Sequence, residues 1–239
     1  MNTNNLSGDS PDQYNADAFP KPSVTVDVAA FTAREGKLCL LLVKRGVWPF
    51  AGMWALPGGF VLLEEDLDTA ARRELGEETG VAAAHYLEQL YTFGTVGRDP
   101  RTRVISVTYY ALLPGGESGL GVADPTAGTD AAEAKWWAID ELPPLAFDHG
   151  SIADVALKRL RAKLGYTSVA YALLPAEFTL TELQKVYELI LGNALDKRNF
   201  RKKMLSAEIL EGTPRQKRDG AHRPAQLFTF TKREPVFMG

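Results

Sequence analysis

Residues Gly59 to Val81 read GFVLLEEDLDTAARRELGEETGV, and this stretch sets the fold expected for the first part of the chain. It places Glu77 and Glu78 three and four residues after Glu74. On a helix this spacing brings the three carboxylates to one face, within reach of a common point. Carboxylates so close repel one another unless a cation neutralises them, and hard divalent cations prefer carboxylate oxygens. The stretch therefore predicts a helix that holds a divalent metal ion.

The same helix is expected to pack on a sheet and to have defined ends. Its apolar stripe consists of Leu67, Ala71 and Leu75. A repeat of this kind buries one face of a helix against a neighbouring layer. Pro57-Gly58-Gly59 predicts a tight turn before the helix, and Gly80 predicts its C-terminal end.

The whole pattern resembles the Nudix box, in which a Gly, a Glu and the run Arg-Glu-apolar-x-Glu-Glu-x-Gly-apolar stand at fixed spacing. This chain matches every fixed position, with Gly59, Glu65, Arg73, Glu74, Leu75, Glu77, Glu78, Gly80 and Val81. The alternative is an ordinary acidic helix that faces solvent, which requires no such set of fixed residues. The resemblance implies an α/β fold, the Nudix α/β/α sandwich.

The resemblance also implies the chemistry of the site. Glu74, Glu77 and Glu78 would bind Mg²⁺ or Mn²⁺. Gly59 would add its backbone carbonyl as a further ligand, and Arg73 would orient the cluster. A metal ion so placed neutralises phosphate charge and lowers the pKa of a bound water that attacks phosphorus. The implied substrate is a nucleoside diphosphate linked to another group and cleaved between the phosphates.

The general base is a separate question, because in some Nudix enzymes it lies in a loop downstream of the box. Glu133, shortly before Trp136-Trp137, is our candidate, with Asp130 behind it. A lone carboxylate carries little information, so an exposed loop acid without a catalytic role is an equal alternative.

Three arginines are candidates for binding the ligand. Arg45 stands at the end of an expected strand, and Arg98 and Arg101 belong to the run Arg98-Asp99-Pro100-Arg101. Guanidinium groups bind phosphate and ribose oxygens through charge-assisted hydrogen bonds. Each arginine could instead be a solvated surface charge.

Composition indicates a soluble globular protein with two unlike parts. The chain has 239 residues, a net charge of −3 and one cysteine, Cys39, inside an apolar run. No apolar stretch approaches the length of a membrane span and no signal peptide is evident, so we expect a cytoplasmic protein without a membrane partner. Residues 166–239 carry a net charge of +4 and the remainder −7. A basic second part predicts a polyanionic partner.

We expect three segments along the chain: a flexible tail over residues 1–20, a first domain over 21–165 and a second domain over 166–239. Alternating or continuous apolar runs predict strands over residues 23–31, 37–44, 86–94, 103–112 and 135–139. Residues 114–132 read as a loop. A helix is predicted over residues 151–164.

The second part has the pattern of a helix-turn-helix followed by a wing. Thr179 and Glu182 fit a capping box, and Gly192 predicts the end of the first helix. Asp196 is expected to cap a second helix, in which Phe200 and Met204 face the core. Residues 212–223 read as a basic loop between the two strands of a hairpin wing. The pattern predicts a small winged helix-turn-helix domain that binds double-stranded DNA.

The residues expected to contact DNA are basic and fall in two groups. The second helix contributes Lys197, Arg198, Arg201, Lys202 and Lys203, and the wing contributes Arg215, Lys217, Arg218 and Arg223. Arg198 and Arg201 are the better candidates for base contacts, because a guanidinium can bind guanine through two hydrogen bonds. The alternative is a solvated basic helix without a nucleic-acid partner.

A Nudix domain followed by a winged helix resembles the Nudix-related transcriptional regulators, which control NAD metabolism and, in some members, sugar utilisation. The stretches that carry this resemblance are residues 21–27, 98–101, 145–149, 199–203 and 223–228. The family implies binding of ADP-ribose or a related NAD product, and a homodimer on a palindromic operator. Because the box is intact, a second hypothesis remains: a working ADP-ribose or nucleotide-sugar diphosphatase with an accessory C-terminal domain.

Overall fold

The computed structural model describes residues 20–81, 84–115, 124–126, 131–218 and 224–238. Except for Pro20, the tail expected over residues 1–20 lies outside this part of the chain, as do Asp130 and Arg223.

The first part is built on a mixed sheet whose order is β3-β2-β1-β6-β5, with β4 paired to β1 and β7 paired to β2. The central strands β1 and β6 are parallel, and the other pairs are antiparallel. The strands are β1 (Ser23–Arg34), β2 (Lys37–Arg45), β3 (Trp54–Ala55), β4 (Gly58–Phe60), β5 (Tyr86–Phe93), β6 (Val104–Leu112) and β7 (Ala131–Ala138). The five strands expected from the sequence are present, whereas β3 and β4 were not expected.

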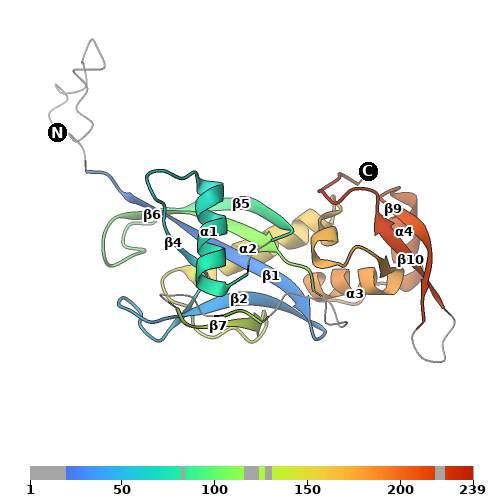
Figure 1. The fold of residues 1–239 in the computed structure, drawn as a ribbon, viewed down its shortest axis with the longest axis horizontal. Helices are drawn as coiled ribbons and strands as arrows, with labels where there is room; N and C mark the ends of the chain where they lie inside the picture. Colours follow the sequence, from blue (N-terminus) through green and yellow to red (C-terminus); the bar gives the residue numbers. More distant parts are fainter. Residues whose placement is uncertain (1–19, 82–83, 116–123, 127–130, 219–223, 239) are drawn as a thin grey trace, which may run out of the picture.

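Helices cover both faces of this sheet, as the sandwich prediction requires (Figure 1). On β1, Val26 and Val28 share a buried cluster with α1 (Leu67–Thr79). The alternate residues Ala29 and Phe31 share a second cluster with α2 (His149–Leu164). Successive side chains of a strand point to opposite faces, so a strand covered on both sides is buried along its length.

The box helix α1 follows its sequence signals closely. The Asp66 carboxylate accepts a hydrogen bond from the Thr69 N–H at 2.7 Å, which caps the first turn. Gly80 ends the helix with φ 68°, a conformation that favours glycine. The tight turn expected at Pro57-Gly58-Gly59 is wrong in part, because β4 begins at Gly58 and pairs with β1.

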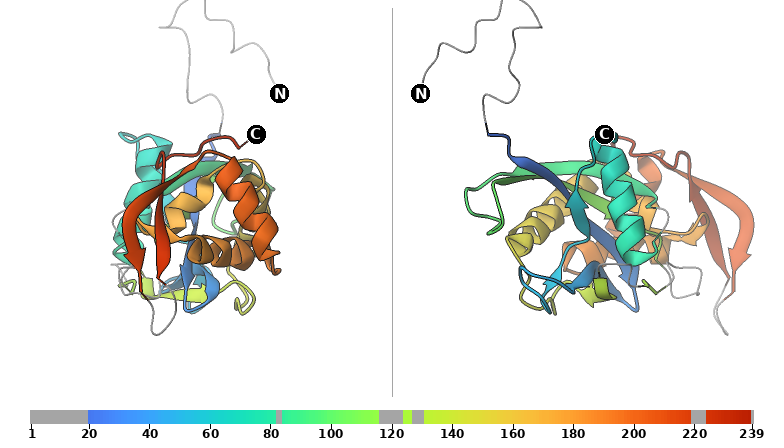
Figure 2. Two further views of the ribbon diagram at one scale, coloured as in Figure 1. Left: turned by 90° about the vertical axis from the view of Figure 1, so that its right-hand side faces the viewer. Right: turned by 60° about the vertical axis from the view of Figure 1, so that its left-hand side comes forward.

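The second part is a three-helix and three-strand unit at one end of the molecule (Figure 2). Its sheet has the order β8-β10-β9. The elements are the 3₁₀ helix η3 (Val169–Leu173), β8 (Phe178–Thr179), α3 (Leu180–Leu191), α4 (Lys197–Ser206), β9 (Leu210–Lys217) and β10 (Ala225–Phe230). The capping box of Thr179 and Glu182 is formed.

The loop predicted over residues 212–223 is wrong for its first half. β9 extends to Lys217, because antiparallel pairing with β10 carries the ladder to the Ala225–Lys217 pair. Basic composition did not prevent strand formation at this edge, where side chains can face solvent.

One hydrophobic core runs through both parts. Phe31 of β1, Leu160 of α2 and Ile190 of α3 belong to the same buried cluster, each with 0% exposure. The boundary expected at residue 165 lies at the end of α2, yet the core does not stop there. Among the described residues, every helix is too short or too polar to cross a membrane.

Candidate nucleotide pocket and nucleic-acid interface

A pocket of about 240 Å³ opens where β2, β4 and α1 meet the loops before β6 and α2. Its lining includes one group of acids and one group of cations. The acids are Asp27, Glu74, Glu78 and Asp99, and the cations are Lys44, Arg45, Arg98 and Arg101. A cavity with both charges suits a ligand that carries phosphates together with a divalent cation.

Glu78 is the most buried carboxylate that α1 contributes to this pocket. Its Oε2 accepts a hydrogen bond from the Gly58 N–H at 3.0 Å. Burial raises the pKa of Glu78 to about 7, and the nearby charges of Glu74 and Asp27 add to the effect. A carboxyl with such a pKa exchanges its proton near neutral pH or holds a cation that replaces that proton.

Arg73 organises the acidic side of the helix, as expected. It donates to Glu65 through Nε and Nη2 at 2.9 and 2.6 Å. Its Nη1 lies between Glu74 at 2.8 Å and Glu77 at 3.0 Å. The Arg73 hydrogen bonds lower the pKa of Glu65 to about 2, so Glu65 is a fixed anion that supports the box.

The three glutamates do not occupy equivalent positions. Glu74 and Glu78 line the pocket, whereas Glu77 is 60% exposed and pairs with Arg73. Gly59 also lines the pocket, and a Cβ at this position would lie 2.4 Å from Oε1 of Glu74. A side chain at this position would displace the Glu74 carboxylate, so glycine lets the backbone pass directly beside it.

These residues fit a divalent cation in the chemistry of their donors. Within the described residues no group of three His, Cys, Asp or Glu side chains is arranged to hold a metal ion. Glu74 and Glu78 nevertheless face one cavity, and burial raises the pKa of both carboxyls. A bound cation would relieve that cost of burial. Glu77 as a third ligand stays a prediction.

Arg45 and Arg101 line the pocket beside one aromatic ring, that of Phe147. The guanidinium carbon of Arg45 lies 4.9 Å from the Phe147 ring centre, and that of Arg101 lies 5.7 Å from it. The Phe60 ring flanks Arg101 on another side at 5.1 Å. Burial, together with the charge of Arg101, lowers the pKa of Arg45. Within the protein, Arg101 donates to the buried Asp99 carboxylate through Nε and Nη2, and Arg45 donates to the Pro49 carbonyl oxygen through Nε. The remaining N–H groups of the two guanidiniums can bond to a diphosphate.

Arg98 lines the same pocket but is bound within the protein. Its side chain is 4% exposed, and its Nε and Nη2 donate to the two oxygens of Asp148 at 3.0 and 2.6 Å. Asp27 lies 3.5 Å from Nη2. A bidentate pair buried in this way holds two segments together. We therefore expect Arg98 to hold the segments around the ligand site in place, and not to be a main contact of the ligand.

Three residues that line the pocket, Asp27, Phe147 and His149, were not predicted as site residues from the sequence. His149 is buried, accepts the Leu56 N–H through Nδ1 at 2.9 Å, and places Nε2 3.5 Å from Asp27. Burial lowers the pKa of His149, so the ring is neutral at neutral pH. The Phe147 ring lies against the guanidiniums of Arg45 and Arg101. All three residues belong to the stretches 21–27 and 145–149, which carry the family resemblance, so the resemblance was the signal that could have identified them.

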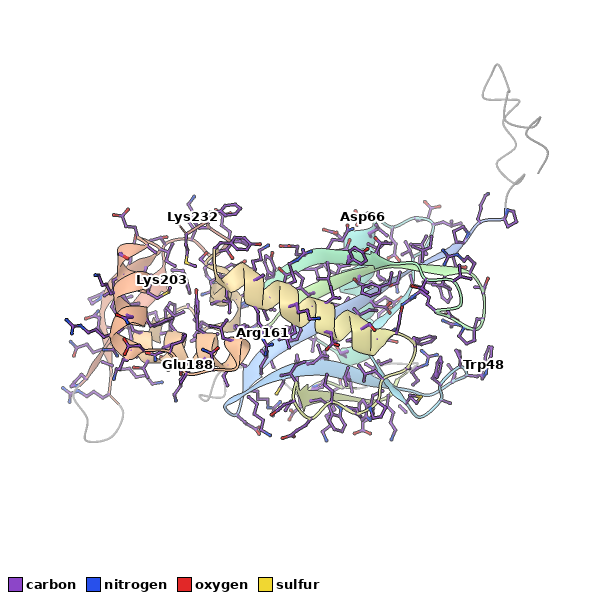
Figure 3. All side chains as sticks on the ribbon, turned by 180° about the vertical axis from the view of Figure 1, so that it is seen from behind. Trp48, Asp66, Arg161, Glu188, Lys203 and Lys232 are labelled. Atoms are coloured by element: carbon purple, nitrogen blue, oxygen red, sulfur yellow. The ribbon has the colours of Figure 1, made fainter. Side chains whose placement is uncertain are left out.

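Glu133, the candidate general base, lies on β7 opposite Lys44, with 3.8 Å between its Oε2 and Nζ of Lys44. It is half exposed and is not among the residues that line the pocket. Its catalytic role stays a prediction. Two tryptophans near this site differ in exposure: Trp136 of β7 is buried, whereas Trp48, in the loop between β2 and β3, is 70% exposed (Figure 3).

The second helix of the helix-turn-helix, α4, presents its basic residues as a group. Lys197, Arg198, Lys202 and Lys203 are exposed. Phe200 and Met204 are buried on the opposite side, and Phe200 packs edge-on against Tyr187 of α3. Arg201 differs from the expectation, because it is partly buried and donates to Thr181 Oγ1 at 3.2 Å. It faces the start of α3 instead of the open face.

Two of the wing residues, Arg215 and Lys217, lie on strand β9, where a loop was predicted. Arg215 of β9 pairs with Glu177 at 2.8 Å, and Lys217 pairs with Glu182 at 2.6 Å. Arg218 follows the strand and is exposed. Arg215 is still 73% exposed, so both it and Arg218 can reach a neighbouring phosphate backbone.

Two family models match this chain. Residues 21–159 match the NUDIX domain family, and residues 170–230 match the family described as the NrtR DNA-binding winged helix domain. The chain is 39% identical over 229 residues to the ADPR responsive transcriptional repressor NtrR of Acinetobacter baylyi, covering 94% of this chain and 88% of that protein.

Two solved structures from Shewanella oneidensis are similar to this one. NrtR complexed with a 27mer DNA has a TM-score of 0.73 and 35% identity, covering 87% of this chain and 93% of that one. The NUDIX domain of NrtR complexed with ADP ribose has a TM-score of 0.52 and 36% identity, covering 62% and 94%. The chain described here belongs to the NrtR family, in which a Nudix domain precedes a DNA-binding winged helix domain.

Proposed function

We propose that this chain is a DNA-binding transcriptional repressor that responds to ADP-ribose or a related NAD-derived nucleotide diphosphate. The winged helix domain binds the operator, and the Nudix pocket binds the effector. The observation that carries the proposal is that one continuous core joins a pocket lined by two arginines on the Phe147 ring to a basic recognition helix. The relatives named above support both halves.

The pocket suits a diphosphate ligand. Its lining combines the cations Arg45 and Arg101, which share the Phe147 ring, with the acids Glu74 and Glu78. A diphosphate between them can bond to the guanidiniums directly. A divalent cation, Mg²⁺ or Mn²⁺, would join the same phosphates to the carboxylates and supply further charge neutralisation.

The test is fluorescence anisotropy of labelled DNA from upstream of the protein's own gene, at physiological salt. We expect specific binding that ADP-ribose weakens, whereas AMP at the same concentration has little effect. Arg45→Ala should bind the same DNA yet lose the response to ADP-ribose. Absence of specific binding, or binding that ADP-ribose leaves unchanged, would contradict the proposal.

A second activity, hydrolysis of the bound diphosphate, is favoured by one observation. The Nudix box is complete, and two carboxylates of that box, Glu74 and Glu78, line one pocket, where burial raises the pKa of both. Glu74 and Glu78 would hold the divalent cation, and Arg73 fixes Glu74. We infer that turnover is slow and secondary to sensing.

Product release from ADP-ribose, measured with Mg²⁺ by chromatography, tests this activity. Glu78→Gln removes one of the two carboxylates that would hold the cation and is expected to lower the rate at least about 100-fold, because a bound cation supplies several kcal/mol of transition-state stabilisation. Glu133→Gln tests the predicted role of Glu133 as general base, and its place outside the pocket lining favours retained activity. Equal rates for the native protein and Glu78→Gln would show that the assigned chemistry is wrong.

We further propose a homodimer, because a palindromic operator presents two half-sites related by a two-fold axis. Sedimentation velocity of the DNA-free protein and the stoichiometry of its DNA complex test this assembly. A monomer that binds DNA one to one would contradict it.

A further inference from the structure

The start of α2 is attached to the nucleotide pocket. Asp148 stands at the cap position of α2, but its carboxylate bonds to no N–H of the helix and instead receives both hydrogen bonds from Arg98. The next residue, His149, lines the pocket and is buried. Arg98 belongs to the loop between β5 and β6, and the same loop carries Arg101, which also lines the pocket. A change in this loop therefore acts directly on the first turn of α2.

The other end of α2 is attached to the winged helix domain. Nε of Arg161 donates to the backbone carbonyl oxygen of Ile190 at 2.7 Å. Ile190 lies in the last turn of α3, where carbonyl groups have no partner within the helix. A positive charge at a helix C-terminus also interacts favourably with the helix dipole. Arg161 thus caps α3 from the neighbouring domain.

The segment between these two attachments is a single rigid element. The 16 residues of α2 form one uninterrupted helix, and a helix of that length spans about 24 Å. Leu160 and Leu164 are buried in the core that also contains Leu183 and Ile190 of α3. In Figure 3, α2 lies in front of the sheet and runs toward the winged helix domain, with Arg161 in its half nearest that domain.

The C-terminal end of α3, which Arg161 caps, is joined by a short turn to the recognition helix α4. α3 ends at Gly192, and a turn of a few residues connects it to α4, which begins at Lys197. Leu195 N–H donates to Glu188 Oε1 at 2.8 Å, which fixes this turn on α3. A shift of the α3 C-terminus is therefore passed to α4 and changes how it meets DNA.

We propose that α2 transmits occupancy of the nucleotide pocket to the DNA-binding helix, with Arg98 and Arg161 as the positioning residues at its two ends. This inference rests on the proposed function. An anionic ligand binds the loop of Arg98 and Arg101 and so favours one position of α2 over another. Through the Arg161 cap, the protein with α2 in that position differs in its affinity for DNA from the protein with α2 in the other position. Such a difference is the requirement for coupling between two sites.

The experiment compares Arg161→Met with Arg161→Lys and with the control Arg159→Met. Met keeps the aliphatic packing and removes the donor, while Lys restores one donor. Arg159 lies on the same helix, but its contacts are to Leu90 O at 3.3 Å and to Glu88, both within the first domain. For each protein, DNA affinity is measured without ADP-ribose and at saturation, and ADP-ribose affinity is measured by calorimetry.

Coupling of this kind commonly changes affinity by about 5- to 150-fold. We expect Arg161→Met to bind both ligands separately as the native protein does, with its DNA affinity changed less than about twofold by ADP-ribose, well below that range. Arg161→Lys should recover part of the response, and Arg159→Met all of it. Thermal denaturation confirms that each variant is folded.

The outcomes separate the two claims. If ADP-ribose does not change DNA binding by the native protein, the proposed function fails. If the native protein responds and Arg161→Met responds equally, the link through α2 fails alone. Should Arg161→Met not fold, hydrogen exchange of the native protein decides. Altered protection of α3 amides 187–191 on binding ADP-ribose supports the link, and unchanged protection overturns it.

Discussion

At the scale of single residues, the environment of each carboxylate matters more than its place in the box motif. Glu65, Glu77 and Glu78 lie on or just before the same helix, but their surroundings differ. Glu65 is bonded to Arg73, Glu77 is largely exposed to solvent, and Glu78 is desolvated by burial. Burial penalises the charged form, and a paired arginine favours it. Glu78, the one of these three that lines the pocket, is the acid whose negative charge is least compensated within the protein.

The first prediction concerns the pH dependence of stability. In the folded protein without metal, burial raises the pKa of Glu78 to about 7 from its ordinary 4.5. The folded state therefore keeps a proton that the unfolded chain loses between these values. The stabilising contribution, about 3 kcal/mol at most, is complete below pH 4.5 and is lost as the pH rises through 7.

Glu78→Gln removes this titration, so the melting temperature should fall less between pH 5 and pH 8 than it does for the native protein. Differential scanning calorimetry in EDTA makes the measurement. Glu133→Gln, an exposed change of the same kind, serves as the control. Parallel pH profiles for the native protein and Glu78→Gln would count against a raised pKa at this position.

The second prediction concerns Arg73. Arg73→Ala leaves the carboxylates of Glu65 and Glu74 without their cation, and both are largely buried, with 8% and 12% of each side chain exposed. Loss of hydrogen bonds to charged groups costs about 1.5–3 kcal/mol, and we expect a loss in that range from urea denaturation. Arg72→Ala, at the exposed neighbouring position, should change stability by less than about 0.5 kcal/mol.

At the scale of elements, the two basic groups differ in how their side chains are used. The exposed residues of α4 are available to a partner, whereas Arg201 is bonded to Thr181 and Lys217 to Glu182. The helical positions follow from spacing, because residues one turn apart share a face, so Phe200 and Met204 define the core side of α4 and the exposed residues between them point away from it. The Arg201 and Lys217 contacts depend on α3, which no spacing within α4 or the wing describes.

The third prediction separates the roles of two residues of α4. Lys202→Ala should weaken binding to all DNA sequences alike and reduce the salt dependence by about one phosphate contact. Arg198→Ala should instead cost about 1–3 kcal/mol on the operator and relax discrimination at one position. Anisotropy titrations on operator and scrambled DNA at several salt concentrations measure both. Equal losses on both DNAs for Arg198→Ala would exclude a base contact by Arg198.

At the scale of the whole molecule, the two parts are expected to unfold together, because one core joins the sheet, α2 and α3. The fourth prediction is that Leu160→Ala, at a fully buried position of α2, lowers stability by about 2–5 kcal/mol. Tryptophan fluorescence reports the first part, since all 4 tryptophans precede residue 166. Far-UV circular dichroism also reports α3 and α4.

We expect the two signals to give one shared transition in urea for the native protein and for Leu160→Ala. Two separated transitions would mean that the parts fold independently in spite of the shared core. Such a result would also weaken the case for α2 as a rigid connection.

The sequence alone was sufficient for the box helix, its caps, the capping box of α3 and the helix-turn-helix, because each depends on contacts between residues a few positions apart. It also indicated the two-part organisation through charge and motif. The roles of Arg98 and Arg161 were decided only by the tertiary structure. Arg98 meets Asp148 50 residues away, and Arg161 meets Ile190 29 residues away. Such pairs arise from packing of whole elements, which local periodicity does not encode.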